Sequence, residues 1–126
     1  SQINIYSHNV VNKGYKDYYP FSKLELLLDK NKFDKASEII LHTESSISKY
    51  EIYAIKIITK EENEHMIIKT VNDELWQEHI DKLLYNTKYC RDDCKINKDD
   101  QILVLQTCNF SPIDTYIILI AKKIAY

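Results

Sequence analysis

Glycine and proline are scarce in this sequence, with one glycine and two prolines among 126 residues. Hydrophobic residues make up 44% of the chain and charged residues 29%, which excludes collagen-like, low-complexity and disordered chains. No run of about 18 apolar residues is present, and the N-terminus lacks the basic-then-apolar layout of a signal peptide. We therefore expect a single domain, residues 1–126, that does not itself cross a membrane.

Positive charge is neither abundant nor concentrated. The 17 lysine and arginine residues are balanced by 19 acidic residues, which gives a formal net charge of −2, and Arg91 is the one arginine. Because no basic block could follow a phosphate backbone, we expect no nucleic acid among the partners.

Cysteine is scarce as well, and its three copies are too few for a scaffold built on disulfides. Cys90 and Cys94 flank three polar residues after a predicted helix, where a disulfide and two free thiols both remain open. No spacing brings these cysteines together with His42, His65 or His79 as zinc ligands. We predict no metal and no cofactor.

The apolar pattern predicts a mainly β (α+β) chain. A first strand begins near Gln2 and ends near Ser7-His8-Asn9, and residues 38–43 and 50–59 form a hairpin. Trp76, Ile80 and Leu83 recur at helical spacing and predict the longest helix, over residues 72–84. The other elements expected are helices at 22–28 and 33–36 and strands at 101–108 and 115–124.

Cys108 is the candidate nucleophile. It lies where a predicted strand runs into a polar loop, so a substrate can reach its thiol. Position alone favours a structural thiol, because free cysteines are among the most buried residues. The residues around it change this interpretation.

The motifs of this chain resemble those of sortases. Val104-Leu105-Gln106-Thr107-Cys108 resembles the family's Thr-Leu-x-Thr-Cys, and Tyr6-Ser7-His8-Asn9 resembles its Tyr-Gly-His-Asn. Residues 21–29 resemble the short helix after the histidine, residues 72–89 resemble the extra helix of class B, and residues 98–103 resemble the lead into the cysteine strand. The resemblance covers essentially the whole chain, in the same order.

The resemblance implies a sortase-like antiparallel β-barrel with short helices and one longer helix before the last two strands. It implies a cysteine transpeptidase outside a Gram-positive cell, anchored to the membrane by an N-terminal segment absent from this chain. Cys108 would form a thioester with the C-terminal sorting motif of a secreted protein, and His8 would be the acid and base. The acceptor would be an amine of a peptidoglycan precursor or a pilin. Thr107, Asn9 and Pro112 would line the substrate groove.

The sequence departs from the family at three places. Tyr116 stands where sortases have an arginine that supports the substrate and the oxyanion, and its hydroxyl lacks the charge and fork of guanidinium. Arg91 is far from this position in sequence, whereas Lys122 and backbone N–H groups are alternatives. Ser7 and Val104 are milder replacements. The chain also begins almost at the histidine motif, so we expect it to be the C-terminal part of a catalytic domain.

Three functions stay open at this stage. The first is a class B-like sortase with Cys108 and His8 as catalytic residues. The second is a sortase-fold protein that binds a surface polypeptide with little or no turnover, which the missing arginine permits. The third is a fragment without a function of its own, whose open barrel is completed by a missing N-terminal segment or by a strand-swapped second copy.

Overall fold

The structure is a computed structural model that describes residues 2–6, 24–36, 38–42, 44–64, 73–91, 95–97, 99–109 and 114–124. For Cys108 and Asn109 it describes the backbone. His8, Asn9, His65, Cys94 and Pro112 lie outside the described residues, so the predictions made for them stay predictions.

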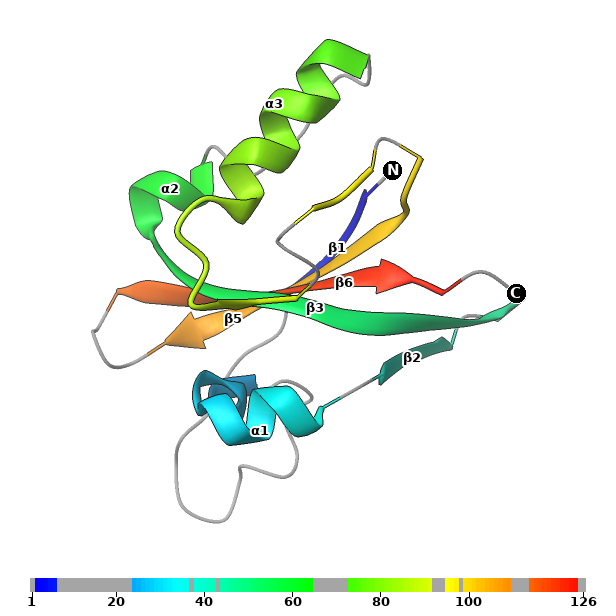
Figure 1. The fold of residues 1–126 in the computed structure, drawn as a ribbon, viewed down its shortest axis with the longest axis horizontal. Coiled ribbons are helices and arrows are strands. Elements are labelled where there is room, and N and C mark those ends of the chain that lie inside the picture. The colour runs from blue at the N-terminus through cyan, green and yellow to red at the C-terminus, as the bar shows by residue number, and fades with distance from the viewer. Residues whose placement is uncertain are drawn as a thin grey trace.

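A curled six-stranded sheet forms the centre of the molecule (Figure 1). Its main path runs β1-β5-β6-β3-β2, and β4 pairs with β3. The pairs are antiparallel except for β1 and β5, which are parallel. The strands are β1 (Gln2–Tyr6), β2 (Glu38–His42), β3 (Ile47–Thr59), β4 (Tyr89–Cys90), β5 (Ile102–Asn109) and β6 (Thr115–Lys123).

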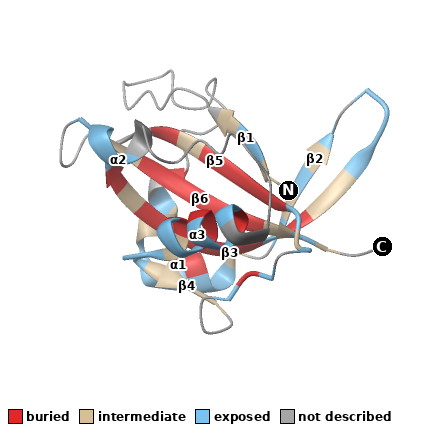
Figure 2. Ribbon diagram, turned by 90° about the horizontal axis from the view of Figure 1, so that it is seen from above, coloured by how far each residue is buried: buried red, intermediate tan, exposed pale blue. Residues whose placement is uncertain are grey.

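The central strands β3, β5 and β6 are apolar on both faces, because helices cover both sides of the sheet (Figure 1). The helix α3 (Asp73–Leu84) lies on one side, and η2 (Leu24–Leu28), a 3-10 helix, lies with α1 (Lys30–Lys35) on the other. A further short helix, α2 (Lys60–Glu64), follows β3 directly. Figure 2 shows that burial is concentrated along the central strands, whereas β2 and the outer sides of the helices are exposed.

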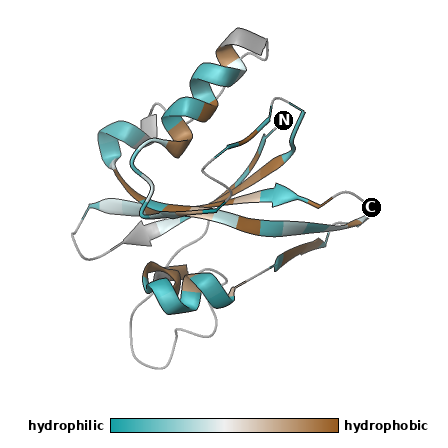
Figure 3. Cartoon of the chain, viewed as in Figure 1, coloured by the Kyte–Doolittle hydropathy of each residue, from teal (hydrophilic) through white to brown (hydrophobic). Residues whose placement is uncertain are grey.

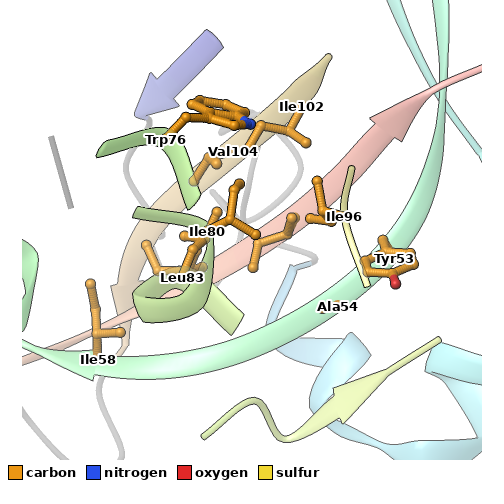
Figure 4. Close-up of a cluster of buried hydrophobic side chains, with 11 residues drawn as sticks. Tyr53, Ala54, Ile58, Trp76, Ile80, Leu83, Ile96, Ile102 and Val104 are labelled. Carbon is orange, nitrogen blue, oxygen red and sulfur yellow. The ribbon is translucent and has the colours of Figure 1, made fainter. Parts of the chain in front are cut away.

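Two hydrophobic clusters follow from this layering, and we name the faces of the sheet after them. On the α3 face, Trp76, Ile80 and Leu83 pack on alternate residues of the strands (Figure 4). On the α1 face, Leu24 and Phe33 pack on the intervening residues. Successive side chains of a strand point to opposite faces, so each buried strand supplies both cores. Figure 3 shows the polar outer side of α3 that this packing leaves to solvent.

The predicted fold class is confirmed: the chain is strand-rich, and its longest helix precedes the last two strands. Three details were wrong. The helix expected at 22–28 is a 3-10 helix that starts at Leu24, and the helical stretch expected at 33–36 starts at Lys30, because Asp29 caps it by accepting from two backbone N–H groups. The short elements α2 and β4 were missed, since neither is long enough to show a period.

Candidate active site

Cys108 is the penultimate residue of β5, and its cross-strand partner on β6 is Tyr116. Residues directly opposite each other in an antiparallel pair point to the same face, with Cβ atoms about 4.5–5.5 Å apart. The position that the sequence comparison assigned to the sortase arginine is therefore the neighbour of Cys108 across the sheet. The role of Tyr116 itself stays a prediction.

The parallel pairing of β1 with β5 bridges the hundred residues between the two motifs. Tyr6, the last residue of β1, is in register with Gln106, which lies two residues before Cys108. Parallel strands bring their carboxyl ends to the same edge of the sheet. The chain after Tyr6, which leads to His8, thus leaves the sheet at the end where Cys108 lies.

Tyr116 is half-buried and packs against the cluster on the α3 face. Across β6 it is in register with Ile58 of β3, which is buried. The row Ile58, Tyr116, Cys108 therefore runs across three strands on one face, the face on which Leu84 of α3 packs. A tyrosine in this row can donate a hydrogen bond from its hydroxyl while its ring is held by apolar neighbours.

Thr107 lies on the other face of β5 from Cys108, because it is the adjacent residue of the strand. Its side chain is fully buried, and Oγ1 has no hydrogen-bond partner among the described residues. Thr107 is thus part of the packing behind the nucleophile, and its assignment to the substrate groove stays a prediction.

Lys122, an alternative to the missing arginine, is at the wrong end of the strand pair. It is in register with Ile102, six residues before Cys108, and it lies 3.5 Å from Asp100 and 4.9 Å from the centre of the Tyr53 ring. Six residues of strand span about 20 Å. Lys122 therefore does not replace the arginine.

Lys56 is the lysine nearest to this row in register, since it pairs with Ile118 of β6, which in turn pairs with Gln106. Its side chain is 2% exposed. Nζ donates to the carbonyl oxygens of Lys82, Leu83 and Tyr85, at 3.3, 3.3 and 2.8 Å. Burial lowers the pKa of Lys56, and Glu62 opposes this by favouring the charged form. Its three hydrogen bonds all go to the end of α3.

Arg91 also serves the fold. Its guanidinium donates to the carbonyl oxygens of Ile52, Phe33 and Ala36 and lies 4.9 Å from the centre of the Phe33 ring. It follows β4, which pairs with β3 on the edge opposite β6. Arg91 therefore does not stand in for the missing arginine beside Cys108.

Cys90 is disulfide-bonded, which decides between the two alternatives for this residue. Cys108 is out of its reach, because β3 and β6 lie between β4 and β5 and the two cysteines are also four residues apart along the sheet. Three strand spacings alone are about 14 Å, whereas bonded cysteines have Cα atoms about 4.4–6.8 Å apart. Cys94 is the remaining cysteine of the chain.

The described histidines are not near Cys108 in register. His42 is an exposed residue of β2 on the far edge of the sheet. His79 of α3 is buried, its ring centre is 5.8 Å from that of Trp76, and its Nε2 contacts Gln2 Oε1. Among the described residues, no group of three or more His, Cys, Asp or Glu side chains could hold a metal ion. No helix in the described part of the chain is long and apolar enough to span a bilayer.

Lys56 and Arg91 were missed by the sequence analysis. A lysine inside the apolar run of β3 and the chain's only arginine were both visible signals, because a buried cation must find partners. Neither signal tells which carbonyl groups those partners are.

Solved structures similar to the chain define its class. No protein-family model matches it, and no curated protein sequence is significantly similar. Sortase B of Clostridium perfringens matches with a TM-score of 0.85 and 26% identity over 99% of this chain and 66% of that one. Sortase B of the type II pilus of Streptococcus pneumoniae matches at 0.82 and 20%, over 99% and 68%. Sortase B of Staphylococcus aureus, in a substrate complex, matches at 0.77 and 21%, over 98% and 55%.

These matches show that the chain has a sortase fold. Within that class, the fold is sortase B-like. The chain spans between 55% and 68% of the length of these three proteins.

Proposed function

We propose that the protein is a sortase-type cysteine transpeptidase with Cys108 as nucleophile and His8 as acid and base. One observation carries the proposal: the parallel register of β1 and β5 directs the chain leading to His8 toward the edge where Cys108 ends β5. Two short motifs, separated by a hundred residues, thus converge in a fold that is sortase B-like.

The chemistry is acyl transfer in two halves. The Cys108 thiolate attacks the scissile carbonyl of a sorting motif, and the tetrahedral intermediate collapses to a thioester as the amine leaves with a proton from His8. An incoming amine then attacks the thioester, His8 accepts its proton, and the Cys108 thiolate is released. No external oxidant or cofactor is needed for these steps.

Tyr116 takes the place of the arginine in this proposal. Its position across from Cys108 suits a single hydroxyl donor to the oxyanion. Loss of one oxyanion donor costs about 2.7–4 kcal/mol in other enzymes, or roughly 10²–10³ in rate. A neutral donor in place of guanidinium therefore predicts slow turnover.

The substrates we propose are polypeptides. Staphylococcus aureus sortase B was solved with a substrate, and another sortase B was solved with triglycine, which supports a peptide partner in general. By the same analogy we propose secreted proteins with a C-terminal sorting motif as acyl donors, and a cell-wall or pilin amine as acceptor. The site of action would be the outer face of a Gram-positive membrane, with this chain forming the C-terminal part of the catalytic domain.

A trapping experiment tests the catalytic proposal. The chain is incubated with sorting-peptide mimics that carry a thiol-reactive group in place of the scissile bond, and the adduct is located by mass spectrometry. We expect modification of Cys108 that is faster than that of free cysteine, and its loss in His8→Ala. Labelling no faster than that of free cysteine, in both variants, would refute a His8-activated nucleophile.

A second candidate is a sortase-fold protein that binds a polypeptide without turning it over. It is favoured by one observation: in the described structure Tyr116, not a cation, is the cross-strand neighbour of Cys108. Under this candidate, peptide binding measured by calorimetry survives Cys108→Ala and no product forms with the parent protein. Under the first, Tyr116→Arg raises the rate of product formation.

A further inference from the structure

A short segment on the edge of β3 holds the helices of the α1 face. This segment, Tyr89 to Arg91, is here called the strap. Its backbone pairs with β3 on the side away from β6, with Tyr89 opposite Ile55 and Cys90 opposite Ala54. The Arg91 N–H donates to the carbonyl oxygen of Tyr53 at 2.9 Å and so extends the pairing by one residue.

Tyr89 fastens the end of η2. Its hydroxyl donates to the carbonyl oxygen of Leu28, the last residue of η2, at 3.0 Å. Its ring centre is 5.4 Å from that of Phe33, the buried residue of α1. The last carbonyl groups of a helix lack partners within the helix, so a donor at this place satisfies one of them.

Arg91 fastens the end of α1 in the same way. One guanidinium nitrogen donates to the carbonyl oxygen of Ile52 at 2.8 Å, and the other donates to those of Phe33, at 2.6 Å, and Ala36. Ala36 is the C-cap of α1. A planar fork of donors can reach a strand and a helix end at once, which the single ammonium of lysine cannot do in this geometry.

Cys90 lies between these two residues and is disulfide-bonded. Since the register excludes Cys108, the partner within the chain is Cys94, four residues further on. The bond therefore closes a short loop directly beside Arg91. Such a loop restricts the conformations open to the strap in any locally opened state.

We infer that the strap is a redox-sensitive fastening in which Arg91 is a positioning residue for the candidate active site. The disulfide holds Arg91, and Arg91 with Tyr89 holds η2 and α1. These helices begin directly after residues 7–23, the segment that contains His8. The effect on the helices stands on the contacts alone, whereas the effect on Cys108 rests on the proposed function.

The redox step is a thiol–disulfide exchange. A dithiol reductant supplies two electrons and two protons, the S–S bond at Cys90 breaks, two cysteine thiols form, and the reductant becomes a cyclic disulfide. In an oxidising, extracellular setting the strap stays fastened, and a reductase of the dithiol class would release it.

Hydrogen exchange tests the fastening without reference to catalysis. The full chain is compared oxidised and after reduction by dithiothreitol, with exchange followed by mass spectrometry. We expect exchange over residues 24–36 to speed up by about tenfold or more, while β5 and β6 keep their rates. Unchanged exchange over 24–36 would overturn the inference, and so would an equal rise in β5 and β6, which would mean that the bond supports the whole fold.

Arg91 variants in the oxidised protein separate its role from that of the disulfide. Arg91→Met keeps much of the apolar stem and loses the donors, so it should reproduce the faster exchange over 24–36. Arg91→Lys keeps the charge over Phe33 but not the fork, and it should lie between the two. Lys88→Met is the matched control, because Lys88 is an exposed neighbour whose ammonium lies 5.8 Å from the Tyr89 ring centre. An Arg91→Met chain that exchanges like this control would refute the positioning role.

The pH profile of Cys108 alkylation gives a readout that a merely structural residue would not move. If His8 partners Cys108, iodoacetamide should react with the parent protein at lower pH than with an ordinary thiol. Arg91→Met should shift that profile toward higher pH, whereas Lys88→Met should leave it unchanged. An ordinary profile in the parent protein would count against the proposed function, while the exchange experiment would still decide the fastening. A normal shift retained in Arg91→Met would overturn the positioning role.

Discussion

The two faces of the sheet are fastened by the same device, applied from opposite directions. On the α3 face, Lys56 reaches out of β3 and donates to carbonyl oxygens at the end of α3. On the α1 face, Arg91 lies beside β3 and donates to carbonyl oxygens at the end of α1. In both cases a cation meets the negative end of a helix, where it also interacts favourably with the helix dipole.

The difference lies in the setting of each cation. Lys56 is 2% exposed, and burial lowers its pKa, so its charge is held against a desolvation cost. Arg91 is half-buried, and its guanidinium carries a permanent charge. The α3 face thus depends on a buried ion and a large apolar contact, while the α1 face depends on short helices, one buried ring and a disulfide-bonded strap.

Removal of the Phe33 ring should have the largest effect. Phe33 is 1% exposed, and both Arg91 and Tyr89 stack against it. We expect Phe33→Ala to lower the free energy of unfolding by about 3–5 kcal/mol, the usual cost of deleting a buried phenylalanine. Urea unfolding measures the change, and Leu26→Ala, at an exposed residue of η2, is the control. A loss below about 1 kcal/mol, the scale of an ordinary point mutation, would show that the α1 face does not depend on this ring.

The second prediction removes the buried ion from the α3 face. Lys56→Met keeps the length of the side chain but leaves the carbonyl groups of Lys82, Leu83 and Tyr85 without their donor. We expect a loss of about 2–3 kcal/mol in the free energy of unfolding, typical of hydrogen bonds to a charged group. Lys82→Met, at an exposed residue of α3, should cost far less. Equal stability of Lys56→Met and the parent would mean that water can satisfy these carbonyl groups.

The sequence predicted the parts of this comparison that depend on periodic patterns. Trp76, Ile80 and Leu83 indicated α3 and its buried side, and the apolar runs indicated β3, β5 and β6. The motif around Cys108 and the count to Tyr116 indicated a pair of positions that the register places opposite each other. The site residues His8, Asn9 and Pro112 lie outside the described residues and stay predictions.

The fastenings could not be predicted, because each depends on tertiary contacts of a single side chain. Lys56 looks like an interruption of an apolar strand until α3 is placed above it. Tyr89 and Cys90 form a strand of two residues, which has no period to detect. Arg91 contacts residues that lie 39, 55 and 58 positions away in the sequence.

A smaller, pH-dependent effect is expected from His79, which joins α3 to the start of β1 through Gln2. Burial, with a further contribution from Lys82, lowers the pKa of His79 below its ordinary value of 6.5. The unfolded chain then binds this proton at higher pH than the folded one, so stability rises with pH through the interval between the two pKa values. The contribution is lost as the pH falls through the lowered pKa.

His79→Gln, which keeps an amide for Gln2 but cannot be protonated, should therefore flatten the acid side of the stability profile. At about pH 7.5 we expect it to cost about 1 kcal/mol, the scale of one hydrogen bond. Thermal unfolding from about pH 5 to about pH 8, the range in which histidine titrates, checks both statements, with His42→Gln as the control because His42 is exposed on β2. If parent and His79→Gln lose stability in parallel below pH 6.5, another group is responsible.

The smallest effect should come from Lys30, and it shows that placement matters more than charge. Its ammonium lies 2.8 Å from Asp34 Oδ1 and 5.3 Å from the Tyr89 ring centre, but the two side chains of the ion pair are 61% and 52% exposed. Exposed pairs four residues apart on a helix contribute about 0.3–0.5 kcal/mol, and about 1 M salt screens them. Lys30→Met should thus cost no more than this in urea unfolding and nothing measurable in about 1 M NaCl. A loss as large as that of Lys56→Met would contradict the view that a cation fastens a helix here only where it is buried against the helix end.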